Sequence, residues 1–207
     1  MTVAAVIVPR DRAEALADAA GRAAVRRIVD IAWAGGAMPI VVVVDDPEGS
    51  VAAVIAGSPA RIAGGAGAGG GSYRTGADEA TAAVVGTDGW LLWPGDHAWV
   101  DPETVTSLIE AHGARPLEVL RPVHAGRSGW PILVPPGRAD LLDRLATDPS
   151  GVDADAAVLL DLGDPGTVAT LAMTIDEVPE FVGPAAPVAG PPPDWGAAAA
   201  DEPDEPD

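Results

Sequence analysis

Short apolar runs separated by alanine-rich stretches form the main pattern along this chain. The clearest runs are residues 3–8, 40–44 and 90–93, which are rich in valine, isoleucine, leucine and tryptophan. Continuous apolar runs of this length are typical of buried strands in a parallel sheet. Between the first two runs, residues 12–34 carry apolar side chains at three- and four-residue spacings, which predicts one long helix or two helices broken near Gly21. A strand, a helix and a strand in this order predict a right-handed βαβ unit.

The same alternation continues through the rest of the chain. It predicts helices over residues 51–56, 76–86, 103–112 and 138–146, and strands over residues 60–63, 117–120, 130–134, 158–160 and 168–173. Asp101, which precedes Pro102, is expected to cap the helix over 103–112, and Ser72 has the side chain of a helix cap. The whole pattern predicts an α/β fold, a three-layer Rossmann-like sandwich around a mostly parallel sheet.

Length and composition indicate one folded domain followed by a tail. A chain of 207 residues is long enough for one sizeable core. The end of the chain contains mainly Pro, Ala, Gly, Asp and Glu, a composition that cannot bury enough apolar surface to fold. We therefore assign residues 1–185 to the domain and 186–207 to a disordered acidic tail. The glycine-rich residues 64–71 form either a mobile connector or a loop that faces a ligand.

Charge and composition exclude several classes of function. The net charge of −19 argues against nucleic acid and against anionic membrane surfaces, because both require a basic surface. The chain has no cysteine, which excludes disulfides, a thiolate zinc site and a cysteine nucleophile. All of its basic residues are arginine. The N-terminus lacks a signal-peptide pattern and the apolar stretches are too short to span a bilayer, so a cytoplasmic location is expected.

Asp96 is the first candidate for chemistry, because it follows the apolar run 90–93 directly after a proline and a glycine. Ligands of open α/β sheets bind just outside the carboxyl ends of strands, and carboxylate oxygens suit Mg²⁺. The alternative role for Asp96 is an Asx turn or a helix cap. Arg127 and Ser128, in a turn between two glycines, could contact an anionic substrate, or Arg127 could simply stabilise the turn.

His97 and three tryptophans surround these candidates. His97 could ligate a metal or contact a substrate, but the three histidines of the chain are scattered and do not form a cluster. Trp93, Trp99 and Trp130 could stack on a base or a pterin ring. Large aromatic side chains near strand ends also commonly pack in the core or at its rim.

Two segments carry a resemblance to a known family. Residues 95–111, GDHAWVDPETVTSLIEA, resemble the GDxPxVxPETIxxLIxA segment of the MobA-like NTP transferases, which include molybdenum-cofactor cytidylyltransferases and guanylyltransferases. Residues 121–134, RPVHAGRSGWPILV, are similar to the family's xPxYxGRRGHPVLF segment. The two motifs have the order and separation found in the family. The resemblance extends more weakly over residues 3–182.

The resemblance implies a nucleotide-diphospho-sugar transferase-like fold and an activity. The family transfers a nucleotide, CMP or GMP, from an NTP to a molybdopterin-type or other phosphorylated small molecule, with Mg²⁺. Asp96 matches the family's metal aspartate and would act in catalysis. Asp176 lies in TIDEVPE, which resembles the family's DIDTPED with one inserted residue, and is a weaker second metal ligand. Ser72, in GSYRTG, matches a helix start that lies by the nucleotide, and His97 replaces the usual glutamine.

The N-terminal phosphate loop departs from the family. Where the family has LAAGxSxRMGxxK, residues 8–12 read VPRDR, without glycine or lysine. Glycine lets a backbone approach phosphate closely and proline has no N–H, so only the charges of Arg10 and Arg12 remain for substrate binding. Two functions stay open. One is a nucleotidyltransferase, and the other is a catalytically silent member that binds a ligand or a partner protein through the face with Asp96 and Arg127.

Overall fold

A computed structural model describes residues 1–64, 72–147, 157–181 and 183 of the chain. The predicted βαβ unit is present as β1 (Val3–Val8), α1 (Arg12–Leu16), α2 (Ala24–Ala34) and β2 (Ile40–Val43). Two helices form instead of one because the backbone turns between them, with Ala20 and Gly21 both at positive φ. The other elements are α3 (Ser50–Ile55), β3 (Ala60–Ala63), α4 (Tyr73–Ala83), β4 (Gly89–Pro94), α5 (Pro102–Ala114), β5 (Leu120–His124), β6 (Arg127–Ser128), β7 (Ile132–Val134), α6 (Asp140–Thr147) and β8 (Val158–Asp161), with 3-10 helices η1 (Pro136–Arg138), η3 (Pro165–Val168) and η4 (Ile175–Glu177).

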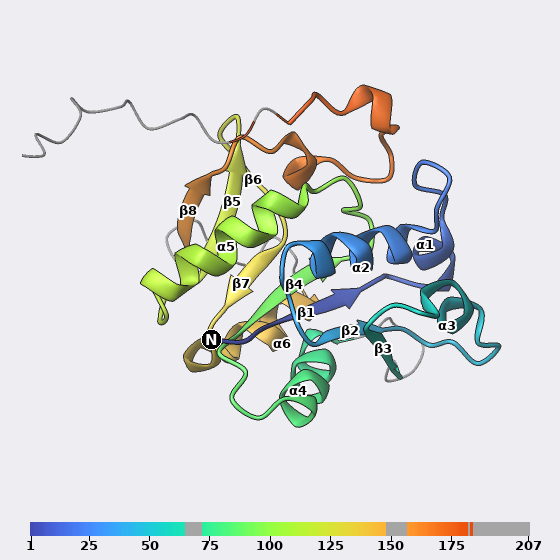
Figure 1. The fold of residues 1–207 in the computed structure, drawn as a ribbon, viewed down its shortest axis with the longest axis horizontal. Helices are drawn as coiled ribbons and strands as arrows, with labels where there is room; N and C mark the ends of the chain where they lie inside the picture. The colour runs from blue at the N-terminus through green and yellow to red at the C-terminus, as the bar shows by residue number, and fades with distance from the viewer. Residues whose placement is uncertain (65–71, 148–156, 182, 184–207) are drawn as a thin grey trace, which may run out of the picture.

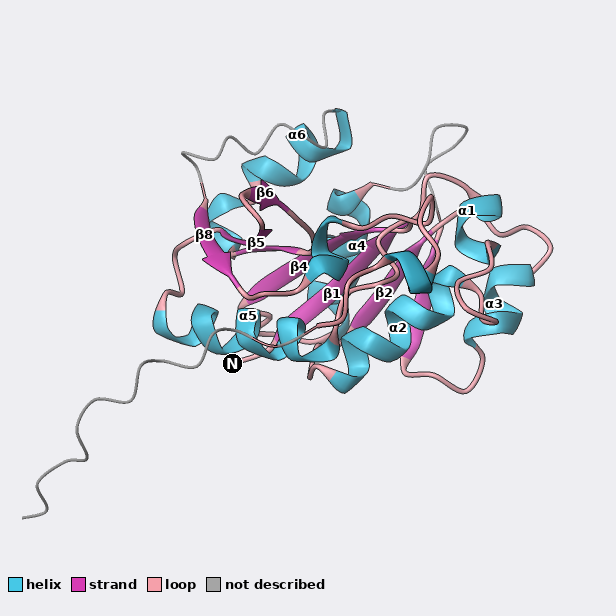
Figure 2. Cartoon of the chain, turned by 90° about the horizontal axis from the view of Figure 1, so that it is seen from above, coloured by secondary structure: helices cyan, strands magenta, loops and turns pink. Residues whose placement is uncertain are grey.

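The strands form one sheet in the order β3-β2-β1-β4-β7-β5-β6, and β8 pairs with β5. Strands β3, β2, β1 and β4 are mutually parallel, whereas β7 runs antiparallel to β4 and β5. Ile7 of β1 lies opposite Val42 on one side and Trp93 on the other. The carboxyl ends of β1, β2 and β4 therefore lie at one edge of the sheet, as the sequence predicts (Figure 2).

Helices cover both faces of this sheet (Figure 1). On one face, α2 and α5 pack on a core that includes Ala5 and Ile7 of β1. On the other face, α4 and α6 pack on a second core that includes Ala4 and Val6 of the same strand. Successive side chains of a strand point to opposite faces, so one apolar strand supplies both cores. The predicted three-layer α/β sandwich with a mostly parallel central sheet is confirmed.

Both predicted helix caps are present. The side chain of Asp101 accepts a hydrogen bond from the backbone N–H of Glu103 at 2.8 Å, with Pro102 in the first turn of α5. The hydroxyl of Ser72 accepts one from the N–H of Arg74 at 3.1 Å. Because Ser72 caps the helix, α4 begins at Tyr73, as the predicted cap requires, and it ends at Ala83, three residues before the predicted end at residue 86.

Helix α4 lies directly against β1 because it carries a glycine at the contact. A Cβ built on Gly76 would lie 2.2 Å from Cγ1 of Val6 and 2.8 Å from Cγ2 of Val43. Both distances are far shorter than a van der Waals contact. The absent side chain therefore sets how closely the helix approaches the sheet.

The strand predicted over residues 168–173 is wrong. The 3-10 helix η3 ends at Val168, and residues 169–173 form a loop and a turn. Contacts with other parts of the chain hold the preceding residues in place. The carboxylate of Asp164 accepts hydrogen bonds from the N–H of Asp101 and of Gly166 and from the hydroxyl of Thr104. A Cβ on Gly166 would lie 2.0 Å from the carbonyl oxygen of Trp99. These contacts bend the segment across the loop that follows β4.

Two further boundaries differ from the prediction. Strand β5 begins only at Leu120, since Leu117 is 80% exposed in the turn before it. The predicted turn over residues 126–129 is shorter, because Arg127 and Ser128 pair with β5 as the short strand β6. The predicted tail, residues 186–207, and the glycine-rich stretch from residue 65 to 71 lie outside the described residues. None of the helices in the described part of the chain is long and apolar enough to cross a membrane.

Candidate functional site

The ends of β1 and β4 meet so closely that only glycine fits between them. The N–H of Gly95 donates to the carbonyl of Val8 at 3.2 Å. A Cβ on Gly95 would lie 2.6 Å from Cα of Pro9, so any side chain here would force the two strand ends apart. The next residue, Asp96, is thereby placed beside the junction of β1 and α1, at the edge of the sheet where the sequence predicts it.

The carboxylate of Asp96 is held by its neighbour. Its Oδ1 lies 2.7 Å from Nδ1 of His97, and its side chain is 37% exposed. Burial raises the pKa of Asp96, but the hydrogen bond from His97 and the charges of His97 and Arg10 lower it below the ordinary value. Asp96 is therefore ionised at neutral pH, and only its Oδ1 is engaged by His97.

Glu14 lies next to Asp96 and was not predicted from the sequence. Its Oε2 accepts a hydrogen bond from the backbone N–H of Arg10 at 2.6 Å, and its Oε1 lies 3.5 Å from Nη2 of the same residue. Its side chain is only 10% exposed. Burial raises the pKa of Glu14; the hydrogen bond from Arg10 opposes the rise, and the charge of Asp96 adds to it. The four-residue spacing of Arg10 and Glu14 is the one signal that could have indicated this pair.

These groups line one pocket of about 390 Å³ at the carboxyl edge of the sheet. Its lining includes Arg10, Asp11, Glu14, Asp96 and Leu171. The N–H of Leu171 donates to the backbone carbonyl of Asp96 at 2.8 Å, so the segment after η3 closes one side of the pocket. We refer to this space as the Asp96 pocket. It combines three carboxylates, those of Asp11, Glu14 and Asp96, with one guanidinium.

Aromatic side chains support Asp96 from the other face of the sheet. Trp130 stacks on Tyr73, with ring centroids 6.3 Å apart, and lies 6.2 Å from the ring of His97. Burial, together with the charges of Asp96 and Glu14, raises the pKa of Tyr73, so its hydroxyl keeps its proton. The start of α4 therefore lies near Asp96. Trp130 is itself 7% exposed and packs mainly in the core.

The donor atoms of the pocket fit a hard divalent cation that ligand or water oxygens complete. Among the described residues, no group of three His, Cys, Asp or Glu side chains is placed to hold a metal. Mg²⁺ and its analogues commonly use one or two carboxylates and take the remaining oxygens from water and substrate phosphates. Asp96 suits such a partial site, whereas both oxygens of Glu14 face Arg10. Asp176 is exposed in η4 and is absent from the lining of the pocket, so its role as second ligand stays a prediction.

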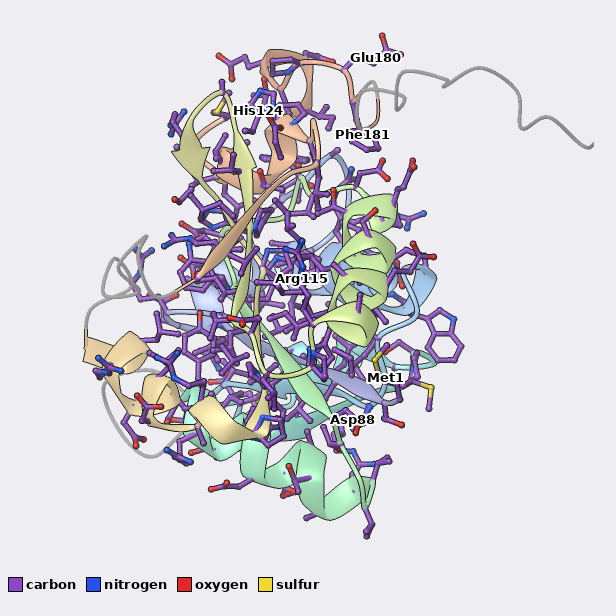
Figure 3. The ribbon with its side chains drawn as sticks, turned by 90° about the vertical axis from the view of Figure 1, so that its left-hand side faces the viewer. Met1, Asp88, Arg115, His124, Glu180 and Phe181 are labelled. Carbon is purple, nitrogen blue, oxygen red and sulfur yellow. The ribbon has the colours of Figure 1, made fainter. Side chains whose placement is uncertain are left out.

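The other predicted residues are distributed over the surface. Arg10 lines the Asp96 pocket with its side chain 78% exposed. Nη1 of Arg12 lies 2.7 Å from Oε2 of Glu48, an ion pair that directs it toward α3. Arg127 and Ser128 are exposed on β6 and do not line the pocket. His124, which lies opposite Arg127, is at the tip of β5 (Figure 3). The structure thus groups Arg10, Asp96 and His97 near the start of α4, without Arg12 and the β6 pair.

Comparisons with known proteins concern the family and the fold. The sequence model described as the MobA-like NTP transferase domain matches residues 11–161. Rv0371c from Mycobacterium tuberculosis H37Rv, solved with manganese, is 19% identical, has a TM-score of 0.58 and covers 78% of this chain and 89% of its own.

Two further solved structures are similar to the same extent. A 4-diphosphocytidyl-2C-methyl-D-erythritol synthase is 18% identical with a TM-score of 0.58, over 81% of this chain and 92% of its own. The 2-C-methyl-D-erythritol 4-phosphate cytidylyltransferase of Thermus thermophilus is 14% identical with a TM-score of 0.54, over 82% and 92%. At these identities the likeness shows a common fold. No curated protein sequence matches the chain.

Proposed function

The chain belongs to the MobA-like NTP transferase domain family, and on this premise we propose a function for the Asp96 pocket. The pocket binds a nucleotide or another phosphorylated small molecule together with a divalent cation. Transfer of a nucleotide, the reaction expected of this family, is weak in this member. The conclusion rests on one observation, which is that the carboxylate of Glu14 occupies the backbone N–H of Arg10.

This hydrogen bond opposes tight binding of a triphosphate. Pro9 has no N–H, and Glu14 takes the N–H of Arg10, so neither residue donates a backbone hydrogen bond to phosphate. A phosphate here would also meet the charges of Glu14 and Asp96. Charge-assisted hydrogen bonds contribute about 1.5–3 kcal/mol each. Losing two or three of them converts a micromolar site into one of about millimolar affinity.

The Asp96 side of the pocket supports phosphate chemistry once a cation is present. Asp96 would hold the cation, and the hydrogen bond from His97 keeps the Asp96 carboxylate oriented. A bound divalent cation neutralises phosphate charge and polarises the phosphoryl oxygens. Arg10, exposed at the rim, supplies the one positive charge of the pocket lining.

A second candidate is full nucleotidyl transfer to a molybdopterin-type acceptor. The position of Asp96 directly after β4, within a segment that matches the family, favours it. In that case another part of the chain replaces the phosphate loop, and the start of α4 at Ser72 is the nearest predicted anion contact. The first proposal also includes a catalytically silent protein that binds a partner protein through the surface around Asp96.

Calorimetric titration of CTP and GTP with Mg²⁺ or Mn²⁺, combined with a pyrophosphate-release assay, tests these alternatives. We expect binding at about millimolar concentration, at least tenfold weaker in Asp96→Asn, and no measurable pyrophosphate. Glu110→Gln removes an exposed charge from α5 and serves as the control. Robust turnover that Asp96→Asn abolishes would establish the second candidate and refute weak transfer. Turnover that Asp96→Asn leaves unchanged would place the site elsewhere. In Asp176→Asn, weakened cation binding would identify a second ligand.

A further inference from the structure

A second pocket lies on the α2 side of the molecule, between α2, the loop after β4 and the segment that ends near residue 181. Its volume is about 500 Å³, which is in the range of small-molecule sites. Its lining includes Arg22, Arg27, Ile31, Trp99, Val178 and Phe181. It shares no lining residue with the Asp96 pocket. We call it the Arg27 pocket.

Arg27 is half-buried and keeps its terminal nitrogens without a carboxylate partner. Its Nε donates to the carbonyl of Ala98 at 2.8 Å, and its guanidinium lies 5.1 Å from the ring centroid of Trp99. No carboxylate in the described part of the chain forms an ion pair with it. Burial and the nearby charge of Arg22 both lower the pKa of Arg27, although a guanidinium stays charged at neutral pH. A positive charge is therefore held in place, oriented and unneutralised.

Four carboxylates also line the Arg27 pocket, those of Asp30, Asp101, Asp164 and Glu180, and the first three already have partners. Asp101 accepts the capping hydrogen bond of α5 at 2.8 Å. Asp30 pairs with Arg22 at 3.2 Å and with Arg26 at 2.9 Å. The carboxylate of Asp164 accepts three hydrogen bonds, from the N–H of Asp101, the hydroxyl of Thr104 and the N–H of Gly166. Glu180 is exposed and lies at the outer edge of its segment, beyond Phe181 (Figure 3). In a chain with a net charge of −19, Arg27 thus stands out as a cation that the surrounding carboxylates do not neutralise.

One side of the pocket is apolar and includes the ring of Trp99, whereas carboxylates occupy other parts of the lining. Trp99 is 7% exposed, and its Nε1 donates to the carbonyl of Thr170 at 3.0 Å, which fixes the ring. Ile31 and Val178 provide aliphatic surface nearby. An apolar wall beside an unneutralised guanidinium is complementary to a ligand with an apolar body and one anionic group.

We propose that the Arg27 pocket binds a small organic anion, a carboxylate or phosphate attached to an apolar body about the size of an aromatic ring. The terminal nitrogens of Arg27 contact the anionic group, and Arg22 at the rim offsets the charge of Asp30, with which it is paired. The apolar body lies against Trp99, Ile31 and Val178. This site is separate from the Asp96 pocket and does not depend on the function proposed there.

Calorimetric titration of the full chain with phenyl phosphate, benzoate, inorganic phosphate and phenol tests the proposal. We expect phenyl phosphate or benzoate to bind at least tenfold more tightly than inorganic phosphate and phenol, which each lack one half of the recognised chemistry. The comparison between phenyl phosphate and benzoate identifies the preferred anion. Equal binding of inorganic phosphate and phenyl phosphate would overturn the proposal, because the apolar wall would then contribute nothing.

Substitutions locate the site. Arg27→Met keeps the aliphatic stem and removes the charge, and we expect it to weaken binding of the preferred anion at least tenfold. Arg61→Met removes one exposed charge from β3 and should leave binding unchanged. Equal losses in both variants would mean that only net charge matters, which contradicts the proposal. Asp96→Asn must keep the binding, since loss there would place the ligand in the Asp96 pocket instead.

A second substitution covers the case in which Arg27→Met does not fold. The side chain of Arg22 is 64% exposed, so Arg22→Met should fold with an unchanged melting temperature. We expect it to weaken binding severalfold, less than Arg27→Met, because it acts only through its charge at the rim. If Arg22→Met folds and binds the anion as tightly as the unaltered chain, the proposal is wrong.

Discussion

The carboxylate oxygen Oε2 of Glu14 lies 2.6 Å from the backbone nitrogen of Arg10 and accepts its hydrogen bond. This contact joins the first turn of α1 to the second residue after the end of β1. In proteins that bind phosphates after a first strand, free backbone N–H groups at such a junction contact the anion. Here an internal carboxylate already occupies that position. Glu14 therefore acts on ligand binding in two ways, by taking a donor and by adding negative charge.

Glu14→Gln should strengthen nucleotide binding. Glutamine keeps an oxygen that can accept from Arg10, so the junction stays folded, while one negative charge leaves the Asp96 pocket. We expect the affinity for GTP with Mg²⁺ to rise about tenfold, equivalent to about 1.4 kcal/mol. Isothermal titration calorimetry measures it, with Glu110→Gln as the control for net charge. An unchanged affinity in Glu14→Gln would mean that Glu14 does not restrict the site.

Nucleotide binding should also depend on pH through the same residue. Burial raises the pKa of Glu14, whereas that of Asp96 is lowered. As pH falls from neutral, Glu14 takes up its proton first while Asp96 remains ionised, so we expect binding to strengthen. It should weaken only when Asp96 is protonated at still lower pH. The nucleotide also titrates, so the measurement is the difference between the unaltered chain and Glu14→Gln, which should lack the rise that Glu14 causes.

Asp164 should stabilise the fold more strongly at mildly acidic pH than at neutral pH. Burial raises the pKa of Asp164 in the folded chain, although its hydrogen bonds from Asp101, Thr104 and Gly166 oppose this. Between the ordinary and the raised pKa, the folded chain holds a proton that the unfolded chain has released. The free energy of unfolding therefore falls as pH rises through this window.

Asp164→Asn isolates this contribution. In this variant the amide nitrogen faces at least one of the hydrogen-bond donors that now contact the carboxylate. We therefore expect the free energy of unfolding to fall by about 1–3 kcal/mol. Urea denaturation of both chains should show the difference in stability increasing as pH falls from about 7 toward about 4. Carboxylates with lowered pKa values are common to both chains and cancel in this difference. A difference that does not vary with pH would show that Asp164 has an ordinary pKa.

Gly76→Ala should destabilise the protein despite the better helix propensity of alanine. The gain in propensity is about 1 kcal/mol, but the new methyl group would overlap Val6 and Val43, and overpacking costs about 1–3 kcal/mol. We expect a lower melting temperature. Adding Val6→Ala should recover part of the loss, because the closest obstacle is a side chain of Val6. If Gly76→Ala alone raises the melting temperature, α4 does not lie as close to β1 as described.

The sequence predicted those features that depend on local pattern. The apolar run of β4 and the Pro-Gly that ends it placed Asp96 at the edge of the sheet, and Ser72 and Asp101 are caps recognisable from their neighbours. Contacts between distant segments were not predictable. The ion pair of Arg12 with Glu48 and the stacking of Tyr73 on Trp130 depend on how the elements pack.

The wrong strand over residues 168–173 has the same origin. Its apolar composition is typical of a strand, but the hydrogen bonds that Asp164 accepts from the loop after β4 and from α5 decide its path. Glu14 was missed for a different reason. Its spacing from Arg10 was visible, yet a salt-bridged helix surface was as consistent with that spacing as a carboxylate that turns back to a backbone N–H.

The contact of Gly166 with the carbonyl of Trp99 limits how this protein can change during evolution. The obstacle to a side chain at Gly166 is a main-chain oxygen, 2.0 Å from where a Cβ would lie. Every amino acid at position 99 carries that same oxygen, so no partner substitution can make room. At Gly76 the first obstacle is a side chain, and a lineage can accept a larger residue there after a smaller one appears at Val6. No second substitution can relieve the overlap at position 166. We therefore expect related sequences to keep glycine there while neighbouring positions change.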